Sequence, residues 1–147
     1  MFLSPHFTLE EFTVSQTAAR LGIDNTPPPD VIERLKHTAL GLEGIRILLG
    51  VPILITSGYR CLELNRALGS KDTSQHVLGE AVDFVAPAYG APTTVMSRVI
   101  DVGIDYDQCI LEYANKKGQG WVHVSFAKTN RRSALVIDDS GTRPYMA

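Results

Sequence analysis

The chain has 147 residues, enough for one domain with a sizeable hydrophobic core. With 44% hydrophobic and 20% charged residues it has the composition of a folded globular protein, which argues against intrinsic disorder. A net charge of −2 argues against nucleic-acid binding, which normally goes with an excess of basic residues. No stretch is long and apolar enough for membrane insertion.

Helices are predicted in the first third of the chain. Thr8 and Glu11 form a capping-box pattern for a short helix, and a second one is predicted from Ser15 to Leu21, before Gly22. Three prolines then interrupt regular structure. After them, apolar residues recur at helical spacing, which predicts a long helix from the third proline up to Gly50.

Short strands dominate the rest of the chain. Strands are predicted over residues 53–57, 81–85, 108–113, 121–126 and 135–137, and helices over 61–68 and 95–102, the latter capped by Thr93 or Thr94. This order predicts an α+β fold with a small, mainly antiparallel sheet and helices packed on one face.

We expect a single domain over residues 1–147, with a helical region at about 7–50, a sheet region at about 51–137 and an exposed tail at 138–147. The first six residues show neither a basic start nor an apolar run, so we expect no signal peptide and synthesis in the cytoplasm. Cys61 and Cys109 are too few for a disulfide framework; we expect two buried thiols, with their pairing left open.

Two stretches carry residues suited to chemistry, Ser74 to Phe84 and Trp121 to Phe126. Each contains a strand pattern in which apolar residues alternate with others, which is typical of a strand with one buried face. The alternation puts Asp83 opposite the apolar face of the first strand and His123 opposite that of the second. His76 comes from a turn just before the first strand.

Two His nitrogens and one carboxylate oxygen make a three-ligand set that leaves a zinc ion one open position for water, as in catalytic zinc sites. Taken singly, a strand Asp is more often a cap or an ion-pair partner, and a strand His is more often structural. The combination favours a metal site. His6 and His37 lie among polar neighbours or near the terminus and are interpreted as surface residues.

The spacing of these residues resembles a known family. The pattern His-x-x-Gly-x-Ala-x-Asp from His76, followed by Trp-x-His-x-Ser from Trp121, resembles the zinc D-alanyl-D-alanine carboxypeptidase family. Thr-Ser-Gly-Tyr-Arg at 56–60, with the later Asn65, is similar to that family's approach to its first ligand. Residues 7–12 and 25–28 look like the N-terminal region of small phage-type members, so the resemblance runs from about residue 7 to about residue 126.

The resemblance implies a zinc cofactor held by His76, Asp83 and His123 and a fold shared by D,D-peptidases and the hedgehog signalling domain. It implies a peptidase acting on the stem peptide of peptidoglycan, either as a D-Ala-D-Ala carboxypeptidase or as an endopeptidase of the phage endolysin type. The bond that is cut stays open. We expect a monomer that reaches the cell wall after release or delivery, in a phage or prophage context. The alternative is an inactive zinc domain that binds cell wall or protein, such as a phage structural component.

Peptide hydrolysis also needs positive charge for the oxyanion and a base for the water. Arg60 is the oxyanion candidate because, in the family, an Arg after Gly-Tyr lies by the substrate; the alternative is a surface Arg paired with Glu63. Ser74 and Gln75 either bind substrate or orient His76.

Trp121 shares a strand face with His123 and either forms the bottom of a substrate cleft or belongs to the core.

Many relatives carry an acid three residues before His123, where this chain has Gly120. Glu112, on the preceding strand of the predicted hairpin, is the substitute base that we favour. Asp107 and Asp105 are weaker candidates.

Overall fold

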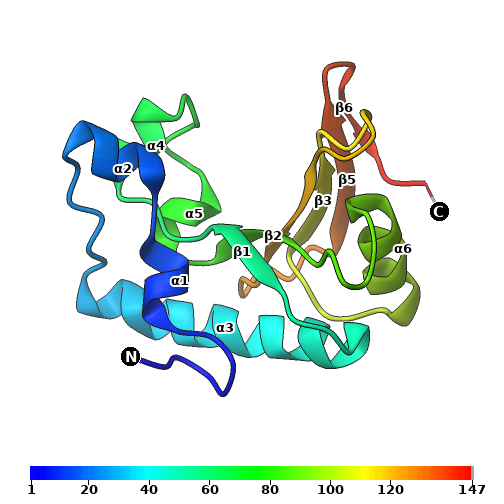
Figure 1. Cartoon of the computed structure of the whole chain (residues 1–147), viewed down its shortest axis with the longest axis horizontal. Helices are drawn as coiled ribbons and strands as arrows, with labels where there is room; N and C mark the ends of the chain where they lie inside the picture. The colour runs from blue at the N-terminus through cyan, green and yellow to red at the C-terminus, as the bar shows by residue number, and fades with distance from the viewer. Residues whose placement is uncertain (147) are drawn as a thin grey trace.

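The computed structural model describes residues 1–146 and shows a six-stranded sheet with helices around it (Figure 1). The elements are α1 (Leu9–Thr13), α2 (Gln16–Leu21), α3 (Pro29–Leu49), β1 (Leu54–Ser57), α4 (Leu62–Ala67), α5 (Gln75–Leu78), β2 (Ala81–Val85), α6 (Pro92–Val102), β3 (Gln108–Glu112), β4 (Trp121–Ser125), β5 (Ser133–Asp138) and β6 (Gly141–Pro144). The predicted α+β class is confirmed.

The strand order in the sheet is β1-β2-β4-β3-β5-β6. Every neighbouring pair is antiparallel except β3 and β5, so the sheet is mixed but mainly antiparallel, as predicted. The hairpin of β3 and β4 pairs Glu112 with Trp121 and Ile110 with His123, which confirms the pairing inferred from the sequence.

The two faces of the sheet differ in chemistry. Val82 and Phe84 of β2 and Val122 and Val124 of β4 are fully or almost fully buried in one hydrophobic core. Long helix α3 and helix α6 supply much of the rest of that core. Figure 1 shows α3 running beneath the sheet and α6 beside β3 and β5.

The opposite face of the sheet carries the polar side chains of Asp83, Glu112 and His123. Helix α5 packs against β2 and brings its side chains to this face, so the prediction that all helices lie on one face is only partly right.

None of the helices within residues 1–146 combines the length and apolarity that crossing a membrane requires. Cys61 is half-buried and Cys109 is buried, and both are free thiols.

Three local differences from the sequence prediction have simple causes. Helix α5 is a single helical turn, too short for periodicity to reveal, where the sequence predicts only a turn before the strand. Helix α6 begins at a proline and has Ala91 in place of a Thr cap. The expected tail contains β6, which is exposed throughout and lacks apolar alternation. It pairs with β5 around a turn in which Asp138 accepts hydrogen bonds from Ser140 and Arg143.

Candidate metal centre

His76, Asp83 and His123 meet on the polar face of the sheet, each offering a ligand atom within 4.8 Å of the others. Asp83 Oδ1 lies 3.3 Å from His76 Nε2 and 2.9 Å from His123 Nδ1. All three residues are buried, with 3%, 6% and 8% of their surface exposed, respectively. The structure therefore brings together the three residues that the sequence proposed as metal ligands.

Sheet pairing explains how two of these side chains meet. Asp83 of β2 is the cross-strand partner of His123 of β4, and directly paired residues of an antiparallel ladder point to the same face. Their strand neighbours are the valines and Phe84 that fill the core on the other face. The hydrophobic alternation therefore forces the carboxylate and the imidazole together.

His76 reaches the cluster from α5. Its backbone N–H donates to Ser74 Oγ at the start of the helix, and its ring Nδ1 lies 2.7 Å from the carbonyl oxygen of Gly58. A carbonyl only accepts, so Nδ1 carries a proton and donates it to Gly58, which leaves Nε2, on the Asp83 side of the ring, as the nitrogen that can bind a metal. Gly58 has no room for a side chain, because a Cβ there would overlap the backbone of Phe12.

The cluster favours an ionised carboxylate. Burial raises the pKa of Asp83, but the charges and hydrogen bonds of His76 and His123 outweigh it and hold this pKa below its usual range. An ionised carboxylate and imidazole nitrogens with free lone pairs are the donors that zinc requires. The residues therefore fit a zinc ion with a position left open.

Glu112 stands beside the cluster without belonging to the three-ligand group. Its Oε1 lies 3.7 Å from His123 Nδ1, and its side chain is 19% exposed. Burial and the nearby Asp83 carboxylate raise the pKa of Glu112 to about 6. The two weaker candidates lie elsewhere: Asp107 is paired with Arg131, and Asp105 is an exposed residue paired with Arg132.

Gly120 explains the missing acid. Its φ of +93° lies in the region that favours glycine. A Cβ at this position would sit 2.6 Å from the Cα of Ala114 and 2.7 Å from the carbonyl oxygen of Glu112. The close approach of the two hairpin strands therefore excludes any side chain at the position where many relatives carry an acid.

Arg60 lies in the site, with 14% of its side chain exposed. Its Nη2 is 3.5 Å from Asp83 Oδ2, its Nε donates to Ser57 Oγ, and its Nη1 donates to Asn65 Oδ1. Burial lowers the pKa of Arg60, while the charges of Asp83 and Glu112 act in the opposite direction. These contacts hold the guanidinium at the cluster and not on the open surface.

A cleft with a volume of about 630 Å³ opens beside the cluster and is lined by Arg60, Asp83 and Trp121, among others. The Trp121 ring is half-buried and its centroid lies 5.6 Å from that of Tyr113. Residues 14–17, which join α1 to α2 and begin α2, also line the cleft. No pattern in the sequence indicates this last contribution, because the helix predicted from Ser15 says nothing about which residues it packs against.

Ser74 and Gln75 make contacts that orient α5. Ser74 caps the helix through the N–H of His76, whereas the Gln75 side chain donates from Nε2 to Asp107 at 2.8 Å. Gln75 lines a separate groove between α3, α5 and the loop after β4. Their predicted contact with substrate stays a prediction.

The geometry agrees with the relationship found by comparison. A family model described as Peptidase M15 matches residues 5–125, a range that contains the His-Asp-His cluster, Arg60 and Glu112. No curated protein matches the chain. The match extends over most of the chain and confirms the resemblance to zinc D-alanyl-D-alanine carboxypeptidases. The chain belongs to the peptidase M15 family of zinc metallopeptidases.

Proposed function

We propose that the chain is a zinc peptidase that hydrolyses a peptide bond in the stem of peptidoglycan. The observation that carries this proposal is the buried cluster of His76, Asp83 and His123 at the side of a cleft, with Glu112 next to it. Family membership supports the zinc peptidase, and the proposed peptidoglycan substrate follows from the sequence resemblance. Two His and one carboxylate also bind iron in some oxygenases, so the ligand set alone fits more than one metal. Membership of a family of zinc peptidases favours zinc over iron.

The three ligands would hold the ion through His76 Nε2, Asp83 Oδ1 and His123 Nδ1. A zinc ion in this position supplies Lewis-acid polarisation of the scissile carbonyl and lowers the pKa of water. The Gly58 carbonyl keeps the His76 ring turned so that Nε2 stays available.

Glu112 is the general base of the proposed reaction. A carboxylate whose pKa is raised to about 6 is largely ionised at neutral pH and still basic enough to take a proton from the attacking water. It returns that proton to the amine as the carbon–nitrogen bond breaks. Arg60 places a positive charge at the cluster, where it can stabilise the oxyanion that develops on the carbonyl.

Trp121 and the hydroxyl-bearing residues of the cleft are the proposed contacts for the peptide chain. The Trp121 ring offers an apolar wall next to the ligands, and Ser15, Thr17 and Ser57 line the same cleft. Peptide groups need such hydrogen-bonding partners around an apolar surface.

We further propose that the protein reaches the wall by release or phage delivery.

An inactive zinc domain is the competing function. Its main support in the sequence was the absence of an acid at Gly120. Glu112 provides a carboxylate 3.7 Å from a ligand nitrogen, which supports the enzyme over the inactive domain.

Digestion of purified cell walls tests the proposal. We expect release of new amino groups without new reducing sugar ends, and mass spectrometry of the fragments identifies the bond. The Asp83→Ala variant serves as the inactive control. New reducing ends without amino groups would overturn the proposal, and binding to walls without any release would favour the inactive domain.

A further inference from the structure

Asp107 is a buried carboxylate for which the proposed reaction has no use. It is 0% exposed and accepts hydrogen bonds from five donor groups. Arg131 supplies three of them, from its backbone N–H, Nε and Nη2; Thr129 Oγ1 lies at 2.6 Å and Gln75 Nε2 at 2.8 Å. A buried charge so fully satisfied is a rigid anchor.

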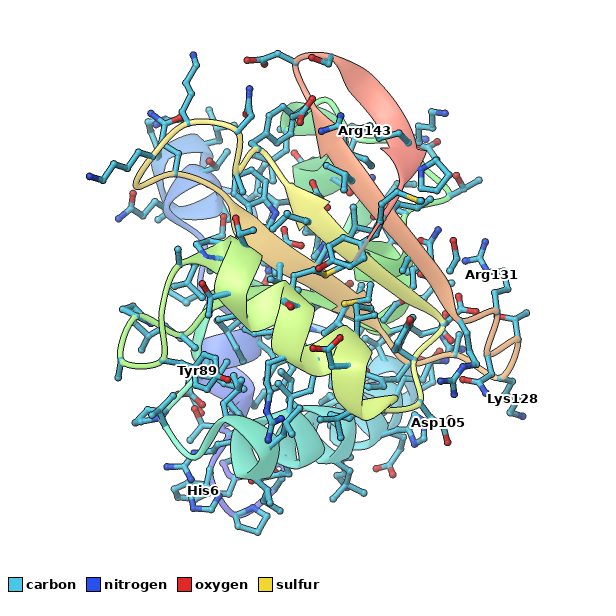
Figure 2. All side chains as sticks on the ribbon, turned by 90° about the vertical axis from the view of Figure 1, so that its right-hand side faces the viewer. His6, Tyr89, Asp105, Lys128, Arg131 and Arg143 are labelled. Atoms are coloured by element: carbon cyan, nitrogen blue, oxygen red, sulfur yellow. The ribbon has the colours of Figure 1, made fainter. Side chains whose placement is uncertain are left out.

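The backbone of Asp107 is fixed as firmly as its side chain. Its N–H donates to the carbonyl of Ser125 at the end of β4, and its own carbonyl accepts from Ser133 at the start of β5. The carboxylate therefore sits where three strands begin or end. Figure 2 shows Arg131 and Lys128 on the loop at this end of the sheet.

Among the donors to the Asp107 carboxylate in residues 1–146, Gln75 is the one that lies on α5, next to the metal ligand His76. Gln75 precedes the ligand His76 on α5, a single helical turn that backbone hydrogen bonding alone cannot stabilise. A carboxylate only accepts hydrogen bonds, so the amide must turn its Nε2 to Asp107. Its Oε1 is then left buried with no partner in the described residues. The amide is held in this orientation although one of its polar atoms goes unsatisfied.

We propose that Asp107 is a positioning residue: through Gln75 it fixes α5, and thereby the imidazole of His76, against Asp83 and His123. This inference rests on the proposed role of His76 as a metal ligand. It assigns no contact with substrate to either residue. Groups that orient a metal ligand typically contribute a factor of about 10 to 100 in metal affinity.

Two variants test the role by zinc affinity, measured by competition with a chromophoric chelator at a temperature where each variant is folded. Gln75→Met keeps the length of the side chain, removes the bond to Asp107 and also removes the unpartnered oxygen, so we expect little change in the melting temperature of the metal-free protein. Asp107→Asn keeps the shape but loses the charge. We expect zinc affinity to fall roughly tenfold in both.

Asp138→Asn is the matched control. Asp138 is also a buried carboxylate paired with an arginine, Arg143, at 2.8 Å. Figure 2 shows Arg143 far along the β5–β6 hairpin from Arg131. We expect this variant to lose stability, as Asp107→Asn does, while its zinc affinity stays within twofold of the unaltered protein.

The outcomes separate the inference from the proposed function. Unchanged zinc affinity in Gln75→Met would overturn the positioning role while leaving the metal centre intact. An equal loss of affinity in Asp107→Asn and Asp138→Asn would also overturn it, because the effect would then follow general stability. Failure of the unaltered protein to bind zinc would overturn the metal centre itself and the positioning role with it.

Discussion

Glu112 Oε1 lies 3.7 Å from Nδ1 of His123, across the hairpin of β3 and β4. Glu112 is two register positions along the ladder from the Ile110–His123 pair, on the same face of the sheet. Its carboxylate is close enough to act on a water at the metal but lies outside the group that would hold the ion. Its raised pKa, caused by burial and by the charge of Asp83, makes it a suitable proton acceptor next to the cluster.

Replacing Glu112 by Gln removes the proton acceptor and keeps size and hydrogen bonding. We expect turnover on purified walls to fall at least about a hundredfold, the lower end of what general-base catalysis contributes. Zinc content and melting temperature should stay close to those of the unaltered protein. Near-normal turnover in this variant would remove Glu112 from the reaction.

Removing a ligand abolishes the response to zinc. At a free zinc concentration about a thousandfold above the dissociation constant, bound zinc stabilises the unaltered protein by about 4 kcal/mol. We expect Asp83→Ala and His123→Ala to show no such stabilisation in calorimetry and to lose stoichiometric zinc in elemental analysis. Full zinc content in both variants would contradict the ligand assignment.

The sequence predicts that Asp83 and His123 lie on one face, because alternation in a strand is a local pattern. The register of β3 against β4 follows from the loop between them, and the faces of Asp83 and His123 follow from their apolar neighbours. The lining of the cleft by residues 14–17 follows from neither. These residues approach the site only through tertiary packing, which no local pattern encodes.

The surroundings of Asp107 also depend on tertiary packing, and no local pattern in the sequence predicts them. Its acidic side chain marked it as a candidate base, but its partners come from Gln75 and from Thr129 and Arg131, all distant in the sequence. An Asp at the start of a strand offers no hint of which donors will surround it. Strand β6 escaped prediction because its polar, exposed residues lack alternation.

Acid should weaken the fold through the buried carboxylates. Hydrogen bonds from Arg131 hold the pKa of Asp107 below its usual value of 3.8, and those from Arg143 do the same for Asp138. A pKa lowered on folding adds stability above pH of about 4, which is lost as pH falls through the folded value. In urea unfolding of the metal-free protein, we expect Asp107→Asn to flatten the loss of stability below pH of about 4. An equally steep loss in the variant would contradict this assignment.

Gly120 and Gly118 offer a test of why the usual acid is missing. Both have positive φ, but a Cβ at Gly118 would meet nothing within 4 Å, whereas one at Gly120 would overlap the backbone of Ala114. We expect Gly118→Ala to cost about 1–2 kcal/mol of unfolding free energy, the strain of a left-handed residue. Gly120→Ala should cost about 2–5 kcal/mol, because overpacking adds to that strain.

The same overlap predicts that an acid introduced at Gly120 cannot replace the base on β3. In the double variant Glu112→Gln/Gly120→Glu, the new side chain fits only if the strands of the hairpin separate, which disturbs β4, the strand that carries His123. We therefore expect turnover no higher than in Glu112→Gln alone, together with weaker zinc binding. Recovery of turnover in the double variant would show that the hairpin accommodates an acid there, and that the glycine does not account for the shift of the base to Glu112.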